Sequence, residues 1–392
     1  MSQMTNQTKK DNTYANLFLS FLRLGLTAFG GPAMIAYIKE LSVNHNKWLD
    51  EETFKDGVSL CQSIPGATAM QMAAYVGLRS NGLMGALLSY AGFGLPAFIL
   101  MLILSVAYVS AHELPFAVSL FKGLQVIVVA IIANATYSFG KGIFKNYREI
   151  LIALISAVLL WLGVSPFVVI IGAALAGTVL LMNTGSPILP TDIRKSSQRE
   201  FKQVMLLFFI FLAGLAGLSI VNIKLFKLAT LMLKIDLFAF GGGFGSVPLM
   251  LHEIVDVRKW VDGKTFMDGI ALGQVTPGPI VITATFVGYL MYGFAGALVA
   301  TMAVFTPSFL ILAVVTPFFD RLKTSNFFMR ATKGILATFV GLLFYATIKF
   351  ASAVPWDVAR ILFVSGALTA LVRKVDILYV VLIGAVISMI IF

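Results

Sequence analysis

One stretch of this chain occurs twice: residues 28–32 read AFGGP and 54–66 read FKDGVSLCQSIPG, while 239–243 read AFGGG and 266–278 read FMDGIALGQVTPG. The glycine stretches lie 211 residues apart and the Pro-Gly stretches 212 residues apart. The spacing continues through further matched positions, among them Gly77 and Gly288, Gly85 and Gly296, Pro96 and Pro307, and Gly123 and Gly334. Self-similarity at a fixed spacing indicates an internal duplication of a half-protein unit.

Composition predicts that this unit lies in a membrane. Hydrophobic residues make up 59% of the chain and charged residues 12%, whereas a soluble domain carries about 25% charged residues. Apolar runs of about 20 residues, long enough to cross a bilayer as a helix, recur along the chain. We therefore expect an all-α polytopic membrane protein in the cell membrane.

Other classes of protein are not supported. The net charge is +11, but Lys and Arg lie in short loops between apolar segments, which is the positive-inside pattern and not a nucleic-acid footprint. A single cysteine, Cys61, excludes a disulfide framework. The three histidines, at 45, 112 and 252, have no metal-ligand spacing, and no hydrolase motif is present. We expect no enzymatic activity, no cofactor, no metal and no nucleic-acid partner.

The expected organisation is a polar tail over 1–13 without a cleavable signal peptide, a first repeat over 14–182, a polar linker plus an unpaired apolar segment over 183–225, and a second repeat over 226–392. Six spans per repeat and the unpaired segment give about 13 transmembrane segments. An odd number of crossings precedes the second repeat, so the two repeats are inverted relative to each other.

Loop charges favour a cytoplasmic N-terminus. On this count the basic loop 258–264 is cytoplasmic, while the turns 112–115 and 291–293 are outside. Treating segments 54–80 and 265–291 as re-entrant loops puts a basic loop on the wrong side. We therefore expect each of them to cross the membrane as one broken helix.

The breaks come at matched places in the two repeats. Inverted repeats with discontinuous helices are typical of secondary transporters, whose sites lie near the membrane midplane. A helix that starts at proline presents free N–H groups and its positive dipole end, which suits an anion. The expected binding positions are Gly30, Gly31, Pro32, Pro65, Gly66, Ala67, Gly241, Gly242, Gly243, Pro277, Gly278 and Pro279. The alternative is that these small residues only allow close helix packing.

Polar side chains near the breaks extend this expected site. Ser63, Thr68 and Thr276 could donate hydroxyl groups, and Thr276 is a plausible N-cap for a helix that starts at Pro277. Gln62 and Gln274 each lie one turn before a Pro-Gly pair and are candidate donors to substrate oxygens.

Charged residues at matched positions in the apolar segments are functional candidates, because a charge inside a bilayer is costly. Arg23 and Lys234 would supply fixed positive charge to the site. Coupling or gating candidates are Lys122, Lys333, Asp56 and Asp268. The alternatives are snorkelling for the basic residues and helix-start acids for the two aspartates.

The FGGP motif after a basic residue, the repeated W…F.DG..L.Q..PG block and the following G..GAL resemble the long two-domain form of the chromate transporter family, over nearly the whole chain. The resemblance implies an inner-membrane transporter that expels chromate, a tetrahedral dianion similar to sulfate, and so confers chromate resistance. The second copy has Gly243 where the first has Pro32, which suggests that the two halves are not functionally equal.

Transport would proceed by alternating access, with one repeat rocking against the other. The rival functions are a channel or transporter for another anion such as sulfate, a carrier of cations or organic solutes, and a membrane scaffold. The scarcity of acids inside the apolar segments argues against a cation carrier. Besides the oxyanion and the lipid bilayer, a second copy in a homodimer is left open as a partner.

Overall fold

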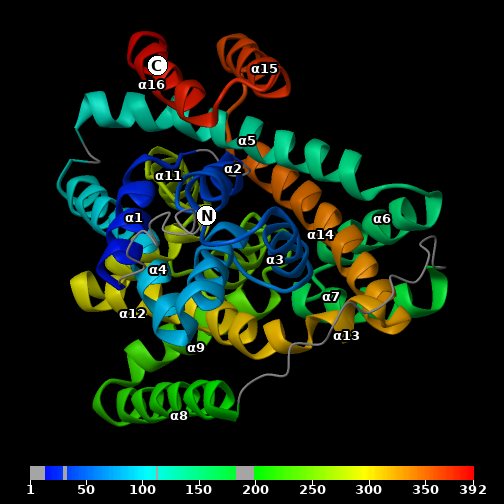
Figure 1. Cartoon of the computed structure of the whole chain (residues 1–392). Coiled ribbons are helices and arrows are strands. Elements are labelled where there is room, and N and C mark those ends of the chain that lie inside the picture. The colour runs from blue at the N-terminus through cyan, green and yellow to red at the C-terminus, as the bar shows by residue number, and fades with distance from the viewer. Residues whose placement is uncertain (1–13, 30–32, 112–113, 182–197) are drawn as a thin grey trace, which may run out of the picture.

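The computed structural model describes residues 14–29, 33–111, 114–181 and 198–392, which form helices and turns without a strand (Figure 1). The polar tail 1–13 and linker residues 182–197 lie outside this range. Five of the helices are long and apolar enough to cross a membrane, and α7, α15 and α16 are shorter apolar helices. The expected all-α polytopic membrane fold is confirmed.

The two repeats have corresponding helices. The first contains α1 (Tyr14–Thr27), α2 (Ala33–Lys39), a π-helical stretch (Glu40–His45), α3 (Glu51–Ser63), α4 (Thr68–Ala111), α5 (Pro115–Ile143), α6 (Tyr147–Trp161) and α7 (Pro166–Leu180). After α8 (Gln198–Val221), the second contains α9 (Ile223–Phe238), α10 (Ser246–Met250), a π-helical stretch (Leu251–Val257), α11 (Gly263–Val275), a 3₁₀ turn (Ile280–Ile282), α12 (Thr283–Val315), a 3₁₀ turn (Thr316–Phe318), α13 (Phe319–Thr324), α14 (Asn326–Ala353), α15 (Val358–Val372) and α16 (Ile377–Ile391).

Helix caps and kinks occur at matched positions in the two repeats. Asp50 caps α3 by accepting the Thr53 N–H, and Asp262 caps α11 by accepting the N–H groups of Lys264 and Thr265. Non-helical dihedral angles at Asn81-Gly82 divide α4 into two helical parts, and the same kink occurs in α12 at Tyr292-Gly293. The duplication seen in the sequence is therefore also present in the backbone.

The segments 54–80 and 265–291 are hairpins, not the broken crossings expected. The Tyr75 hydroxyl of α4 donates to the Thr53 carbonyl of α3 over 3.2 Å, so the two helices run back along each other. A Cβ atom at Gly57 would lie 2.4 Å from the Tyr75 ring, and one at Gly269 would lie 2.4 Å from the Phe286 ring. Each hairpin returns to the end of the bundle from which it started.

The first broken segment of each repeat also folds back on itself. The rings of Phe21 on α1 and Trp48 stack with centroids 6.1 Å apart, and Lys234 on α9 lies 2.7 Å from Glu253 in the following π-helical stretch. Four of the expected crossings are therefore hairpins with the breaks at their tips. Removing two crossings from each repeat keeps the number before the second repeat odd, so the inverted relation stands.

The hairpins change which loops share an end of the bundle. Lys264, at the start of α11, lines one pocket together with Lys122 of α5 and Pro355. The expectation that loop 258–264 and the turn before α5 lie on opposite sides is therefore wrong, because the chain reverses between α9 and α10, at 239–245. We call the end of the bundle that holds Lys122, Lys264 and Pro355 the second end. We call the opposite end of the bundle the first end. It holds the start of α3 and α13, which meet where Lys323 Nζ lies 3.6 Å from Asp56 Oδ1.

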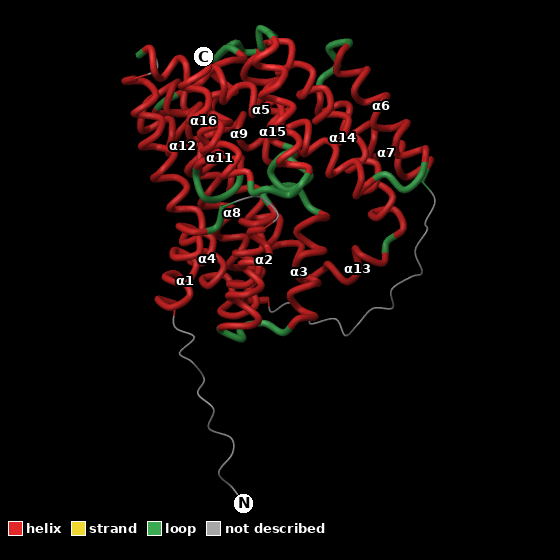
Figure 2. Tube along the Cα trace, turned by 90° about the horizontal axis from the view of Figure 1, so that it is seen from above, coloured by secondary structure: helices red, strands yellow, loops and turns green. Residues whose placement is uncertain are grey.

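The last helices of the two repeats are exchanged. Helices α6 and α7 pack against α14 of the second repeat, and α15 and α16 pack against α5 of the first (Figures 1 and 2). Ser388 on α16 donates to the Ser119 carbonyl over 2.6 Å and accepts the Gly123 N–H over 3.0 Å. On the other side, a Cβ atom at Gly177 would lie 2.9 Å from the Gly334 Cα. Small residues permit these close helix crossings.

Candidate functional site

The tips of the hairpins meet between the two repeats. The Gly66 N–H of the first repeat donates to the Ala239 carbonyl of the second over 2.9 Å, and the Gly278 N–H of the second donates to the Ala28 carbonyl of the first over 3.1 Å. Gly66 has φ +117° and Gly278 has φ +110°, values that favour glycine. The repeated breaks thus form one reciprocal junction.

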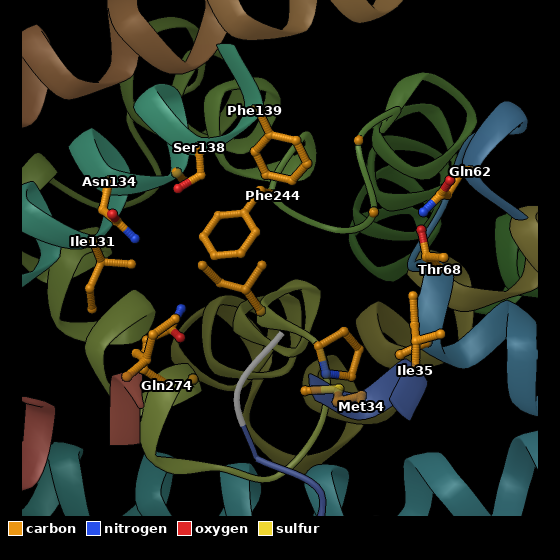
Figure 3. A pocket seen from close by; sticks show the side chains of 18 of the residues that line it. Met34, Ile35, Gln62, Thr68, Ile131, Asn134, Ser138, Phe139, Phe244 and Gln274 are labelled. Carbon is orange, nitrogen blue, oxygen red and sulfur yellow. The ribbon is translucent and has the colours of Figure 1, made fainter. Parts of the chain in front are cut away.

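A cavity of about 460 Å³ opens at this junction. The tips, α3, α4, α11 and α5 all contribute to its wall (Figure 3). Among the described residues that line it, none carries a charged side chain. The polar side chains are neutral: Gln62, Thr68, Asn134, Ser138, Gln274 and Thr276.

Gly241 and Gly242 form part of the wall, and Gly243 follows them in the same loop. All three glycines have positive φ angles, of 85°, 72° and 103°. A Cβ atom at Gly242 would lie 2.9 Å from Thr68 Oγ1, and one at Gly241 would lie 2.3 Å from the Phe339 ring. No acceptor for the three N–H groups is found in the part of the chain that the structure describes. Successive free N–H groups in such turns bind anions.

Gln274 adds a side-chain donor. It lies in the last turn of α11 and points into the cavity in Figure 3. Its Nε2 atom is buried and has no hydrogen-bond acceptor among the described residues. Since buried polar groups are normally paired, this amide is available to a bound ligand.

Helix α5 supplies residues that the sequence interpretation missed. Asn134 and Ser138 lie one turn apart on α5 and face the cavity beside Phe139 (Figure 3). In the sequence, these are two polar residues four positions apart in an apolar segment, which places them on one face of a helix. The sequence does not show that this helix reaches the hairpin tips.

Most of the predicted binding residues are part of the junction, but they differ in role. Gln62, Thr68, Gly241, Gly242, Gln274, Thr276, Gly278 and Pro279 line the cavity. Pro65, Gly66, Ala67, Gly243 and Pro277 belong to the loops at the tips and do not line it. Gly30, Gly31 and Pro32 lie outside the described residues.

The helix starts differ from those expected at the prolines. Helix α4 begins at Thr68 and the helical stretch before α12 begins at Ile280, each three residues after the expected start. Thr276 is the C-cap of α11, and its hydroxyl donates to the Gly273 carbonyl. The Ser63 hydroxyl likewise donates to its own helix, at the Ser59 carbonyl over 2.7 Å. The first turn of α4, at Thr68 and Ala69, still lines the cavity and offers N–H groups without intrahelical acceptors.

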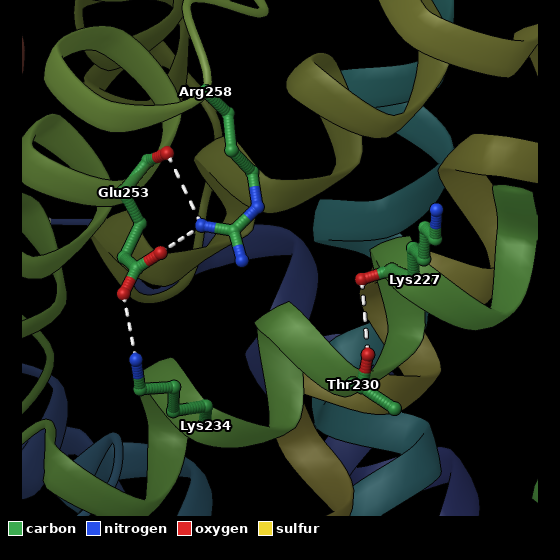
Figure 4. Close-up of polar contacts among 5 residues, drawn as sticks. All are labelled: Lys227, Thr230, Lys234, Glu253 and Arg258. Atoms are coloured by element: carbon green, nitrogen blue, oxygen red, sulfur yellow. Dashed lines mark hydrogen bonds and ion pairs between the residues drawn. The ribbon is translucent and has the colours of Figure 1, made fainter.

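The expected fixed charges lie elsewhere. Arg23 is exposed on α1 and does not line the cavity. Lys234 lies 2.7 Å from Glu253, which also pairs with Arg258 (Figure 4), and its Nζ atom lies 3.7 Å from the centre of the Phe167 ring. The ion pair ties α9 to the π-helical stretch after it, and the ring contact ties α9 to α7.

The coupling candidates also lie away from the cavity. Asp56 is near Lys323 at the first end, and Lys333 is half-buried near the start of α14. Asp268 accepts hydrogen bonds from Gln125 over 2.8 Å and from Tyr108 over 3.0 Å, and it lines a second pocket with Lys122.

The chain aligns along most of its length with known proteins. The chain is 47% identical over 383 residues to an uncharacterized transporter of Methanocaldococcus jannaschii, covering 97% of this chain and 95% of that one. It is 30% identical to a chromate transport protein of Cupriavidus metallidurans, covering 93% and 90% of the two chains. It is 29% identical to a chromate transport protein of Pseudomonas aeruginosa, covering 86% and 81%.

No solved structure matches the chain significantly. The family model described as chromate transporter matches it twice, over residues 15–178 and 226–389, which are the two repeats. With this double match and relatives that align along nearly its whole length, the chain belongs to the chromate transporter family.

Proposed function

We propose that the chain is a secondary transporter that moves chromate, or another tetrahedral oxyanion such as sulfate, across the cell membrane, and that the anion binds in the central cavity. The observation that carries this proposal is the unpaired N–H groups of Gly241–Gly243 beside the unpaired Gln274 amide. The two chromate transport proteins among the relatives support the substrate.

Neutral donors suit a transported dianion. Burying an anion without hydrogen bonds costs far more than a single hydrogen bond returns, so several donors are needed around its four oxygens. The lining provides backbone N–H groups and the side chains of Asn134, Ser138 and Gln274. Because no described lining residue is basic, the anion binds without an ion pair and can leave again. The same donors fit sulfate, so sulfate should compete.

We propose that transport follows alternating access. The reciprocal bonds Gly66–Ala239 and Gly278–Ala28 are the contacts that would change as one repeat rocks against the other. Efflux that confers chromate resistance, with the N-terminus and the first end in the cytoplasm, is the direction we propose. The basic linker cluster 194–202 supports it through the positive-inside rule.

The test is radiolabelled chromate flux in proteoliposomes, with sulfate as competitor and with a pH gradient imposed. The variants Gln274→Leu and Asn134→Leu should lower chromate flux at least about 10-fold, because each removes a hydrogen bond to a charged ligand. Gln203→Leu, on the exposed surface of α8, is the control and should transport normally. Absence of flux from folded wild-type protein would refute chromate as substrate.

The same vesicles distinguish a carrier from a passive channel. Unlabelled sulfate on the opposite side should accelerate chromate movement through a carrier, since the loaded carrier returns faster than the empty one. Flux that shows no such acceleration and no saturation would contradict the carrier.

A further inference from the structure

The pocket at the second end of the bundle differs in charge from the central cavity. It has a volume of about 250 Å³ and lies between the starts of α5, α11 and α15. Its lining contains Lys122, Lys264 and Arg360 against one acid, Asp268. Since a water molecule takes up about 30 Å³ in the liquid, the pocket has room for a small hydrated anion.

The positive charge of the pocket is only partly compensated. Arg360 pairs with Asp357. No acidic partner for Lys122 or Lys264 is found among the residues that the structure describes. Asp268 accepts hydrogen bonds from Gln125 and Tyr108. Among the described residues, three cations of the pocket then face two acids, Asp268 and Asp357.

The pocket and the central cavity share two helices. Helix α5 carries Lys122 and Gln125 in the pocket and Asn134 in the cavity, and α11 carries Lys264 and Asp268 in the pocket and Gln274 in the cavity. At 1.5 Å per residue, Gln125 and Asn134 are about 14 Å apart along α5. The Gln125–Asp268 hydrogen bond joins the two helices within the pocket.

This arrangement is confined to the second end. The residue matched to Gln125 is Leu336, and the residue matched to Lys264 is Glu52. Asp56, which matches Asp268, is half-exposed near Lys323. The duplication therefore did not preserve the cationic pocket in both halves.

We propose that the pocket formed by Lys122, Gln125, Lys264, Asp268 and Arg360 is a second anion site, which holds a small divalent oxyanion on its path between the second end and the central cavity. Cations at the mouth of a low-dielectric path raise the local concentration of anions. This inference rests on the proposed oxyanion transport for its ligand.

The test measures the pocket without requiring transport. Val118 lines the pocket and is replaced by cysteine, while the native Cys61 is buried and stays. A sulfonate-bearing thiol reagent should react with V118C at least about 3-fold faster, relative to a trimethylammonium reagent of equal size, than it does with the control V358C. Val358 is 74% exposed and does not line the pocket. Sulfate should slow the sulfonate reagent at V118C only.

Charge variants decide the cause. In V118C, the added K122Q and K264Q changes should abolish both the reagent preference and the sulfate protection, whereas K122R and K264R should retain them. Equal behaviour of V118C and V358C would overturn the inference. Slowing by anionic lipid in nanodiscs, with no effect of sulfate, would assign the pocket to a lipid headgroup and also overturn it.

Wild-type chromate flux separates this inference from the proposed function. If the wild-type protein transports chromate but sulfate does not protect V118C, only the second anion site is refuted. If sulfate protects V118C but the wild-type protein moves no chromate, the second anion site stands and chromate is refuted as the transported anion.

Discussion

At the residue scale, the glycines at 241–243 are the feature that carries the proposed anion site, because they would supply its backbone donors. Positive φ angles are costly for residues with a side chain, so glycine is needed wherever the loop must turn its N–H groups toward the cavity. Their conformations at φ 85°, 72° and 103° explain why the sequence GGG occurs at this place.

Gly242→Ala should impair both loop and cavity. Its φ of 72° and the 2.9 Å approach of a Cβ atom to Thr68 Oγ1 predict a stability loss of about 1–2 kcal/mol and strongly reduced chromate flux. Thermal unfolding and proteoliposome flux measure the two effects. Gly217→Ala, on α8 with nothing within 4 Å, is the control and should change neither; a fully active G242A protein would contradict the role of the loop.

Lys234→Met should leave the chromate KM within about 2-fold of wild type, because Lys234 pairs with Glu253 and does not line the cavity. Lys234 is half-exposed, and the buried Glu253 keeps Arg258 as its partner, so stability should fall only slightly. Saturation kinetics of chromate flux provide the measurement, with Gln274→Leu as the affected comparison. A large rise in KM would instead assign the lysine to the anion site.

At the element scale, the hairpins decide the topology. Glu52 and Ser80 lie at the open end of the α3–α4 hairpin, one on each arm. Val257 and Tyr292 lie at the open ends of the two hairpins of the second repeat. Because each hairpin returns to its starting end, the members of each pair should face the same side of the membrane.

Thiol labelling tests this topology. Single cysteines at Glu52 and Ser80 should react with a membrane-impermeant reagent from one side, and those at Val257 and Tyr292 from the opposite side. Sealed vesicles before and after permeabilisation give the measurement, with Cys61, which is buried, as the unreactive background. Labelling of Glu52 and Ser80 positions from opposite sides would restore the broken crossing helix.

At the scale of the whole molecule, the two repeats depend on each other. α6 and α7 pack against α14, while α15 and α16 pack against α5, and the junction has one hydrogen bond in each direction. Each repeat alone therefore exposes helix faces rich in small residues and leaves the tip N–H groups unpaired.

Separate halves should consequently assemble only together. When 1–190 and 191–392 are expressed as two chains, we expect neither alone to give monodisperse protein, and both together to copurify and transport chromate. Size-exclusion chromatography and flux provide the readouts, and a version that carries Gly334→Leu, which cannot fit beside Gly177, is the control for assembly. A stable, monodisperse single repeat would contradict the mutual dependence.

The sequence by itself determined the membrane class, the duplication, the family and the positions of the breaks. Composition and repeated motifs are local properties, and proline and glycine interrupt helices wherever they stand. It also placed Gln62, Thr68 and Gln274 near the central cavity that they line, because they flank the breaks.

The tertiary structure alone decided which way the chain leaves each break. Hydropathy gives the same apolar run for a crossing helix and for a hairpin, and only tertiary contacts, such as those of Tyr75 with Thr53 and Gly57, distinguish them. It also brought Asn134 and Ser138 to the cavity and kept Arg23 and Lys234 away from it. Those outcomes depend on how helices from both repeats pack around one junction, which no single segment specifies.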